Sequence, residues 1–243
     1  MSAAPPTRWI AALVLSACLT PQGAFGADAA LHFPAADPAA IARWIGPPPI
    51  PESPQARRDV DELTRVQATR SAADCAFART DAELSIFDPF VGVFGAAATA
   101  EAYPSTTRLI GALVEDTFVI TAVAKAVYNR ARPNVIDGRI RPCIDQPETS
   151  AYPSGHGVFM YTVAEAFSAL VPERRDAIFA RADVFAYNRI VGGIHFPTDA
   201  TASRTAAALY YASASRDPAF AEMFAAARRE LRTGLGLADA VTP

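Results

Sequence analysis

Three short stretches of the sequence combine residue types that can bind an anion and transfer a group from it. In the first, Pro153-Ser154-Gly155 runs directly into His156 and then into an apolar helical run. Serine is a favourable N-cap residue, so the amides of Gly155 and His156 are expected among the unpaired donors of a helix N-terminus. Such a helix end binds anions. This stretch therefore predicts an anion site of phosphate size with an imidazole beside it.

The second stretch, AKAVYNRARP, holds Lys125, the only lysine among the 22 basic residues of the chain. Lys125 and Arg132 are seven positions apart, so two turns of one helix would bring them to nearly the same face. The helix is expected to end at Arg132, because a proline disfavours helical geometry at the residue before it. Lys125 and Arg132 are therefore candidates for one site. A solvated basic face is the alternative, which Lys125 taken alone would favour, and Arg130 is expected to lie on such a face.

The third stretch, NRIVGGIHFPTDA, places a second histidine between two helices. Arg189 is expected to end one helix, two glycines break it, and Pro197 suits the first turn of the next. Asp199 follows His195 by four positions, close enough to accept a hydrogen bond from one ring nitrogen. That bond would fix the tautomer and leave the other nitrogen of His195 free to act as a nucleophile.

Helices must position these residues. Apolar residues at helical spacing predict helices in the segments 55–84, 106–131, 157–170, 173–189, 197–213 and 217–233. No alternating strand pattern and no internal repeat is present in the sequence. A chain of 243 residues suffices for one domain with a sizeable core. We therefore expect an all-α, single-domain helical bundle over residues 55–243.

The N-terminus is typical of a targeting segment. Arg8 precedes a short apolar run from Trp9 to Leu19, and small residues ending at Gly26 form a cleavage site, so residues 1–26 are predicted to be a signal peptide. A lipoprotein signal ending at Cys18 is the alternative, and it would place a lipid anchor there. Both interpretations predict export across a bacterial inner membrane to the periplasm. Residues 27–54, rich in proline and alanine, are expected to form an extended arm on the domain or a linker.

Charge and cysteine content narrow the partners and the redox state. The net charge of −3 and the pI of about 5.6 give no sign of a nucleic-acid-binding surface. With Cys18 in the targeting segment, Cys75 and Cys143 form the predicted disulfide of an exported protein; two buried free thiols are the alternative.

A surface for self-association is a further candidate feature. Phe220, Met223 and Phe224 share one helical face. We expect this face to belong to the core, with a homodimer interface as the alternative.

Taken together, the motifs K-x6-R-P, P-S-G-H and R-x5-H-x3-D resemble the signature of the type 2 phosphatidic acid phosphatase superfamily. That superfamily includes bacterial non-specific acid phosphatases and vanadium haloperoxidases. The chain is most similar to the class A acid phosphatases, also in its length and its GPPP-containing arm. Two positions depart from the usual pattern: Asn188 stands where serine is usual, and Gly157 stands where class A enzymes often have threonine.

The resemblance implies a fold, a reaction and a set of roles. The fold is the helical bundle of that superfamily, and the reaction is hydrolysis of small phosphate monoesters with broad specificity at acid pH, with no metal and no cofactor. His195 would form a phosphohistidine, Asp199 would orient His195, and His156 would protonate the leaving group. The residues implied to bind phosphate are Lys125, Arg132, Ser154, Gly155 and Arg189.

Two other activities remain open at this point. A vanadate-dependent haloperoxidase would use the same cage, since vanadate resembles five-coordinate phosphorus. A phosphatase acting on lipid phosphates is the second alternative, which an acylated Cys18 would favour.

Overall fold

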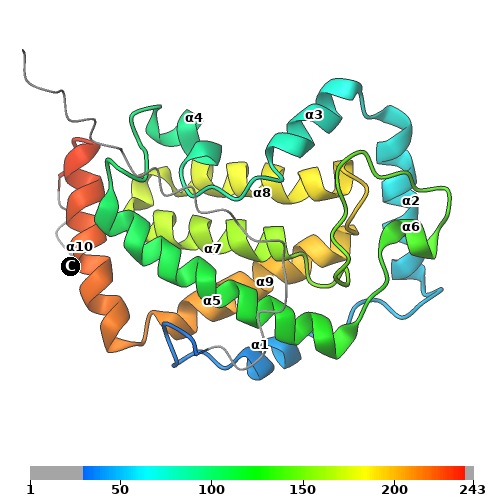
Figure 1. The fold of residues 1–243 in the computed structure, drawn as a ribbon, viewed down its shortest axis with the longest axis horizontal. Helices are drawn as coiled ribbons and strands as arrows, with labels where there is room; N and C mark the ends of the chain where they lie inside the picture. The colour runs from blue at the N-terminus through cyan, green and yellow to red at the C-terminus, as the bar shows by residue number, and fades with distance from the viewer. Residues whose placement is uncertain (1–29, 239–243) are drawn as a thin grey trace, which may run out of the picture.

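The computed structural model describes residues 30–238, and every regular element in this part of the chain is helical (Figure 1). The expected all-α fold is confirmed. The predicted signal peptide and Cys18 lie outside the described residues. In chain order the elements are α1 (Pro38–Ile45), α2 (Pro54–Thr69), α3 (Ala72–Thr80), the 3-10 helix η1 (Asp88–Phe90), α4 (Val91–Phe94), α5 (Pro104–Tyr128), α6 (Pro133–Ile136), α7 (Gly155–Leu170), the 3-10 helix η2 (Pro172–Arg174), α8 (Arg175–Val191), α9 (Pro197–Ala214) and α10 (Pro218–Gly234).

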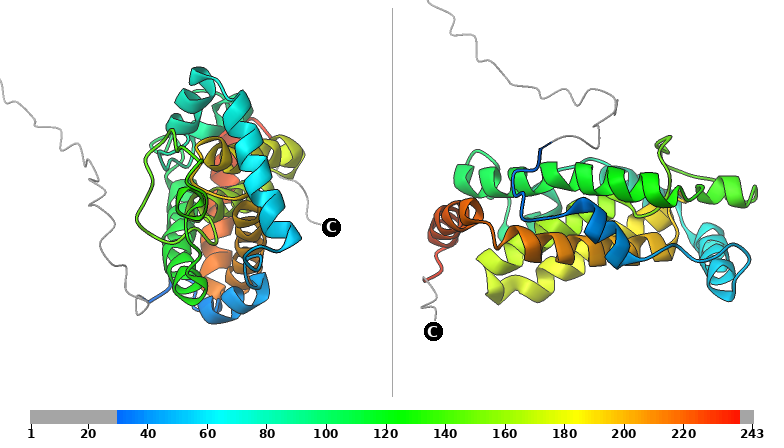
Figure 2. Two further views of the ribbon diagram at one scale, coloured as in Figure 1. Left: turned by 90° about the vertical axis from the view of Figure 1, so that its right-hand side faces the viewer. Right: turned by 90° about the horizontal axis from the view of Figure 1, so that it is seen from below.

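Helix α7 is the centre of the bundle. It packs against α5, α8, α9 and α10. Most of its side chains are buried, and it is apolar nearly all round, as is typical of a helix at the centre of a bundle. The helices α5, α7, α8 and α9 run side by side along the longest axis, while α10 packs across one end (Figure 1). Helix α2 stands at the opposite end, in front of the bundle when it is viewed end-on (Figure 2).

Most of the helices begin where the sequence supplies a cap or a proline. Proline occupies the first turn of α1, α2, α5, α6, α9 and α10, where its missing N–H costs nothing. Ser154 caps α7, and its Oγ accepts from the amide of Gly157. The core face expected on α10 is confirmed for Phe220, which is buried, while Met223 and Phe224 pack partly against the same core. No helix within residues 30–238 has both the length and the apolar character needed to cross a bilayer.

Helix α5 ends earlier than the sequence predicted. It stops at Tyr128, where Asn129 adopts a left-handed conformation (φ 40°) and donates its amide to the carbonyl of Lys125. Asparagine tolerates this conformation better than most residues, so it can close a helix. Arg132 is therefore not on the helix of Lys125: it lies in an extended conformation just before α6. The two cations meet through the loop and not through helical periodicity.

The described part of the proline-rich arm, residues 30–54, packs on α5 and α9 through α1 and is not wholly extended. Asp37 caps a short helix, α1, by accepting from the amide of Ala39, and Ile41 and Ala42 are buried against the bundle. The carboxylate of Asp116 on α5 fastens the start of the arm by accepting the amides of His32, at 2.7 Å, and Phe33, at 3.0 Å.

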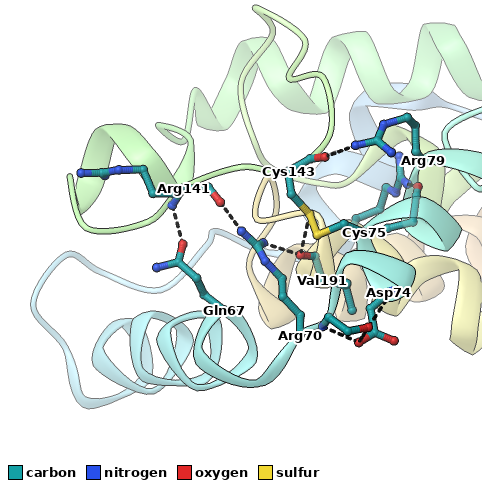
Figure 3. Close-up of a disulfide and its surroundings, with 11 residues drawn as sticks. Gln67, Arg70, Asp74, Cys75, Arg79, Arg141, Cys143 and Val191 are labelled. Carbon is teal, nitrogen blue, oxygen red and sulfur yellow. Dashed lines mark hydrogen bonds between the residues drawn. A yellow bond between two sulfur atoms is a disulfide. The ribbon is translucent and has the colours of Figure 1, made fainter.

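A disulfide ties α3 to the loop that precedes α7 (Figure 3). The Cα atoms of Cys75 and Cys143 are 5.9 Å apart, and the bond closes a sequence separation of 68. Arg79 supports the link by donating to the carbonyl of Cys143 at 2.8 Å. Arg70 adds donations to the carbonyls of Val191, at 2.6 Å, and Arg141. Because Arg70 ends α2, these contacts fasten the junction between α2 and α3 to the end of α8 as well as to the loop.

Removal of this disulfide should lower the free energy of unfolding by about 4 kcal/mol, because a cross-link that closes a long loop restricts the unfolded chain. Urea unfolding with and without reductant measures the difference. A variant carrying both Cys75→Ala and Cys143→Ala is the control, since its stability should not respond to reductant. An unfolding free energy that is the same with and without reductant in the wild-type protein would contradict the prediction.

Candidate active site

Four helix ends meet at one end of the bundle: the C-terminal ends of α5 and α8 and the N-terminal ends of α7 and α9 (Figure 1). The antiparallel path of the chain produces this meeting, because each helix returns along the one before it. The eight residues that the sequence assigned to substrate or catalysis lie here, on those ends or on the connecting loops: Lys125, Arg132, Ser154, Gly155, His156, Arg189, His195 and Asp199.

His195 and Asp199 form a buried pair. The Nδ1 atom of His195 lies 3.2 Å from Oδ2 of Asp199, and both side chains are almost fully buried. The same carboxylate oxygen accepts the amide of Phe196 at 2.9 Å. Because Asp199 is in the first turn of α9, its carboxylate is held by the backbone that also carries His195.

Arg132 determines the tautomer of His195. Its Nη1 lies 2.9 Å from Nε2 of His195, and a guanidinium can only donate, so Nε2 must accept and Nδ1 must carry the proton. Burial lowers the pKa of His195 well below its usual value, and the charges of Arg132 and Lys125 lower it further. The ring is therefore neutral, with the lone pair of Nε2 directed at the cations.

His156 lies in the first turn of α7, with its Nε2 3.0 Å from the carbonyl oxygen of Ala82. A carbonyl only accepts, so Nε2 carries a proton. Burial lowers the pKa of His156 to about 4, and the neighbouring charge of Arg189 contributes in the same direction. An anion bound beside Arg189 would offset that charge and raise the pKa of His156.

Two of the cations are held by backbone carbonyls. Lys125 donates to the carbonyl of Ser150, and burial together with the charge of Arg132 lowers the pKa of Lys125 to about 7. Arg132 donates to the carbonyls of Thr149, at 2.7 Å, and Ile194, at 2.9 Å. Burial lowers the pKa of Arg132 to about 10, so it remains charged at neutral pH.

Arg189 is the third cation and is 1% exposed. It donates to the carbonyl of Ala78, at the end of α3, while its Nε is buried without a partner in the described structure. Burial lowers the pKa of Arg189 to about 10, and the nearby carboxylate of Asp81 opposes that shift. A buried donor without a partner is costly, and an anion in the site would supply one.

Close packing of α7 on α9 explains one departure from the family pattern. A Cβ on Gly157 would come within 2.7 Å of the Cβ and Oγ of Ser203, so the threonine often found there has no room. The Oγ of Ser203 donates to the carbonyls of Ser154, at 2.9 Å, and Asp199, at 2.7 Å. The amide of Ser154 also donates to the carbonyl of Asp199 at 3.3 Å. The P-S-G-H turn is thus joined directly to the start of α9.

The other departure, Asn188, holds a carboxylate near the site. Its Nδ2 donates to Oδ2 of Asp81 at 2.7 Å, and Asp81 also pairs with Arg181. Asp81 is the carboxylate whose charge acts on Arg189. Asparagine at this position therefore fixes a counter-charge beside Arg189.

Arg130 was expected on a solvated basic face, and that expectation is wrong. Its side chain is 7% exposed and pairs with two buried carboxylates, those of Asp59 and Asp199. A signal for this was present in the sequence, because Asp59 lies on the stripe that Leu63 and Val66 bury on α2. A charged residue on the apolar stripe of an amphipathic helix indicates a buried partner.

Within residues 30–238, no three His, Cys, Asp or Glu side chains cluster as the ligands of a metal ion would. The site instead holds three cations, two imidazoles and the carboxylate of Asp199. This arrangement can bind a compact anion and present a neutral imidazole nitrogen to it.

Comparison with known proteins agrees with this geometry. A family model described as the PAP2 superfamily matches residues 106–219. A non-specific acid phosphatase of Salmonella typhi is 29% identical over 200 residues, covering 77% of this chain and 78% of that protein. An acid phosphatase of Zymomonas mobilis is 26% identical over 196 residues, covering 77% of this chain and 74% of that protein.

Two solved structures share the fold. One is a transmembrane PAP2-type phosphatidylglycerolphosphate phosphatase from Bacillus subtilis, with a TM-score of 0.52 and 15% identity over 74% of this chain and 90% of that one. The other is a bacterial vanadium-dependent iodoperoxidase, with a TM-score of 0.56 and 16% identity over 72% of this chain and 53% of that one. The matched region contains all three motifs together with the residues that converge at the four helix ends, so residues 106–219 form a PAP2 superfamily domain.

Proposed function

We propose that the protein is an acid phosphatase that hydrolyses small phosphate monoesters through a phosphohistidine on His195, without a metal or other cofactor. One observation carries the proposal: a neutral imidazole, held by Asp199 at Nδ1, directs Nε2 towards Arg132 among three cations. The names of the related acid phosphatases support the reaction class.

In the first step, phosphate would replace His195 as the partner of Arg132. The transferring group carries negative charge on three equatorial oxygens, and Lys125, Arg132 and Arg189 would hold them, with Ser154 and the amide of Gly155 at the start of α7. Nε2 would then attack phosphorus in line. A P–N bond forms as the P–O bond breaks, and Asp199 stabilises the positive ring that results.

Proton transfer is assigned to His156. The protonated ring would give its proton to the departing alkoxide, so that the leaving group departs as an alcohol. The ring nitrogen that gave up this proton would then take a proton from the water that attacks phosphorus. The P–N bond breaks as the new P–O bond forms, and phosphate is released. The bond from His156 to the carbonyl of Ala82 favours the charged ring.

The shifted pKa values favour activity on the acid side of neutrality. Lys125, with a pKa of about 7, loses its charge as the pH rises through that value, whereas Arg132 and Arg189, each with a pKa of about 10, keep theirs. The pKa of His156 is about 4 before substrate binds, so it needs both acid pH and a bound dianion to carry its proton. Fixed cations would thus do the work that a metal ion does in other phosphatases.

Export to the periplasm is part of the same proposal. The disulfide between Cys75 and Cys143 is suited to an oxidising compartment. The targeting segment at residues 1–26 is the proposed signal, with acylation at Cys18 as the alternative.

Hydrolysis of a panel of phosphomonoesters in the presence of chelator tests the reaction. We expect turnover that chelator does not affect and that declines above about pH 7 as Lys125 loses its proton. If chelator abolished the activity and a divalent ion restored it, the proposed independence from metals would be contradicted. Halide oxidation with added vanadate, in the absence of phosphatase activity, would instead identify a haloperoxidase, and turnover restricted to lipid phosphates would identify a lipid phosphatase.

The two histidines should fail differently when each is replaced by alanine. His195→Ala should abolish turnover of every ester, because it removes the nucleophile. His156→Ala should lose about 10²–10⁴-fold on alkyl phosphates but much less on nitrophenyl phosphate, whose leaving group is weakly basic. The ratio of the two rates in each variant, with a chemical quench for phosphohistidine, measures this. Equal losses on both esters in His156→Ala, or phosphohistidine in His195→Ala, would refute the assigned roles.

Binding of inorganic phosphate should stabilise the protein independently of turnover. At 100 times its Kd, phosphate should raise Tm by about 5–10 °C, because it binds only the folded cage of cations. Lys125→Met should lose most of this shift. Arg139→Gln, which removes an exposed cation paired with Asp137, should retain it. Equal shifts in the two variants would show that phosphate binds elsewhere.

A further inference from the structure

Arg130 lies between two carboxylates that come from distant helices, Asp59 from α2 and Asp199 from α9. Its Nη1 is 2.6 Å from Oδ1 of Asp199, and its Nη2 is 2.7 Å from Oδ2 of Asp59. The guanidinium also stacks on the ring of Phe196 at 4.0 Å. Each terminal nitrogen of the guanidinium therefore contacts one carboxylate, and the aromatic ring fixes the plane of the guanidinium.

The carboxylate of Asp199 is divided between two partners. Oδ1 faces Arg130, while Oδ2 faces Nδ1 of His195 and the amide of Phe196. A rotation of this carboxylate away from Arg130 would also break its contact with His195. The orientation of the imidazole thus depends on a group that does not touch the phosphate-binding cage.

Asp59 connects the same group to the start of α9. Its Oδ2 accepts from the hydroxyl of Thr198 at 2.5 Å, and its Oδ1 accepts from the amide of Thr198 at 3.3 Å. Asp59 is 1% exposed, so its charge is balanced within the protein. The carboxylate of α2 therefore anchors both Arg130 and the helix turn that carries Asp199.

Charge gives this arrangement a chemical consequence. Burial raises the pKa of Asp199 to about 6, and the charge and hydrogen bond of Arg130 oppose that rise. Without Arg130 the carboxyl would take up a proton more readily and would lose its negative charge towards His195. The charged or titratable groups that act on Asp199, directly or through Arg130, are Arg130, Asp59, Lys125, Arg132, His195 and Tyr152.

We propose that Arg130 and Asp59 are positioning residues of the phosphotransfer site: Arg130 keeps Asp199 ionised and aimed at His195, and Asp59 limits how much of the charge of Arg130 reaches Asp199. The inference rests on the proposed function, because its kinetic consequence requires His195 to be the nucleophile.

The two residues should move the pH profile in opposite directions. Arg130→Gln removes the positive charge that keeps Asp199 ionised, so Asp199 should stay protonated up to a higher pH. The acid limb of the pH profile of kcat/KM for nitrophenyl phosphate should therefore move to higher pH. Asp59→Asn removes the opposing negative charge, so the same limb should move to lower pH. In Arg130→Gln, kcat should fall by about 10²-fold, as expected when a reacting group is misplaced, while the Kd for inorganic phosphate stays within about threefold of the wild-type value, because Arg130 lies outside the cage.

Matched variants separate positioning from general damage. Arg139→Gln is the control for loss of an arginine, and its pH profile should match that of the wild type. Arg130→Lys keeps the positive charge but not the forked guanidinium. Compared with Arg130→Gln, it should return the acid limb to its wild-type position but recover only part of kcat. If Arg130→Gln does not fold, the double variant Asp59→Asn/Arg130→Gln removes both charges and should still move the limb upward, because Arg130 contacts Asp199 directly.

A measurement without turnover completes the test. Nitrogen NMR of His195 should show the Nδ1-protonated tautomer in the wild type and in Arg139→Gln, and a smaller fraction of it in Arg130→Gln. An unchanged tautomer together with an unchanged acid limb in Arg130→Gln would overturn the inference, whatever the loss in kcat. If the wild-type protein hydrolyses no phosphate ester, the proposed function fails, while the NMR result still decides whether Arg130 positions the pair.

Discussion

The site depends on how the protein partners its buried cations. Lys125, Arg132 and Arg189 are held by backbone carbonyls, which satisfy donors without cancelling charge. Arg130, by contrast, is paired with two carboxylates and Arg181 with one. Positive charge is therefore neutralised where the fold needs stability and left largely uncompensated where an anion would bind. Burial lowers the pKa values of Lys125 and His195, and the uncompensated charge of the neighbouring cations lowers them further.

Holding such cations in place requires contacts from distant segments. The end of α3 supplies the carbonyl of Ala78 to Arg189, and the loop after it supplies the carbonyl of Ala82 to His156. The disulfide between Cys75 and Cys143 fastens α3 to the loop before α7 (Figure 3). A segment that carries none of the three motifs thus determines where Arg189, a proposed phosphate-binding residue, and His156, the proposed proton donor, lie.

The helices and motif residues were predictable because local chemistry determines them. Prolines and cap residues fix where most helices begin, and the spacing within each motif identifies the residues that meet. The end of α5 was placed too late, because the left-handed Asn129 stops the helix before the proline does. Helix α1 was missed because proline-rich composition concealed the cap at Asp37. The roles of the site residues stay predictions until they are tested.

Arg130 was misassigned for a different physical reason. Its partners, Asp59 and Asp199, are 71 and 69 positions away, and local pattern carries no information about pairs so far apart. A basic residue next to a predicted helix end is usually solvated, and only the position of Asp59 on an apolar stripe indicated otherwise. Buried ion pairs of this kind become visible when the packing of α2 on α9 is known.

The hydroxyl of Ser203 joins the carbonyls of Ser154 and Asp199, and Gly157 lets α7 approach it closely. The turn that would cradle the anion and the segment that carries the proposed nucleophile are therefore joined directly to one another. The proposed line of attack would then depend on the packing of α7 on α9. Mutation of the surrounding loops can then change which alcohol is accepted without disturbing the in-line geometry, so substrate range and catalytic alignment are free to evolve separately.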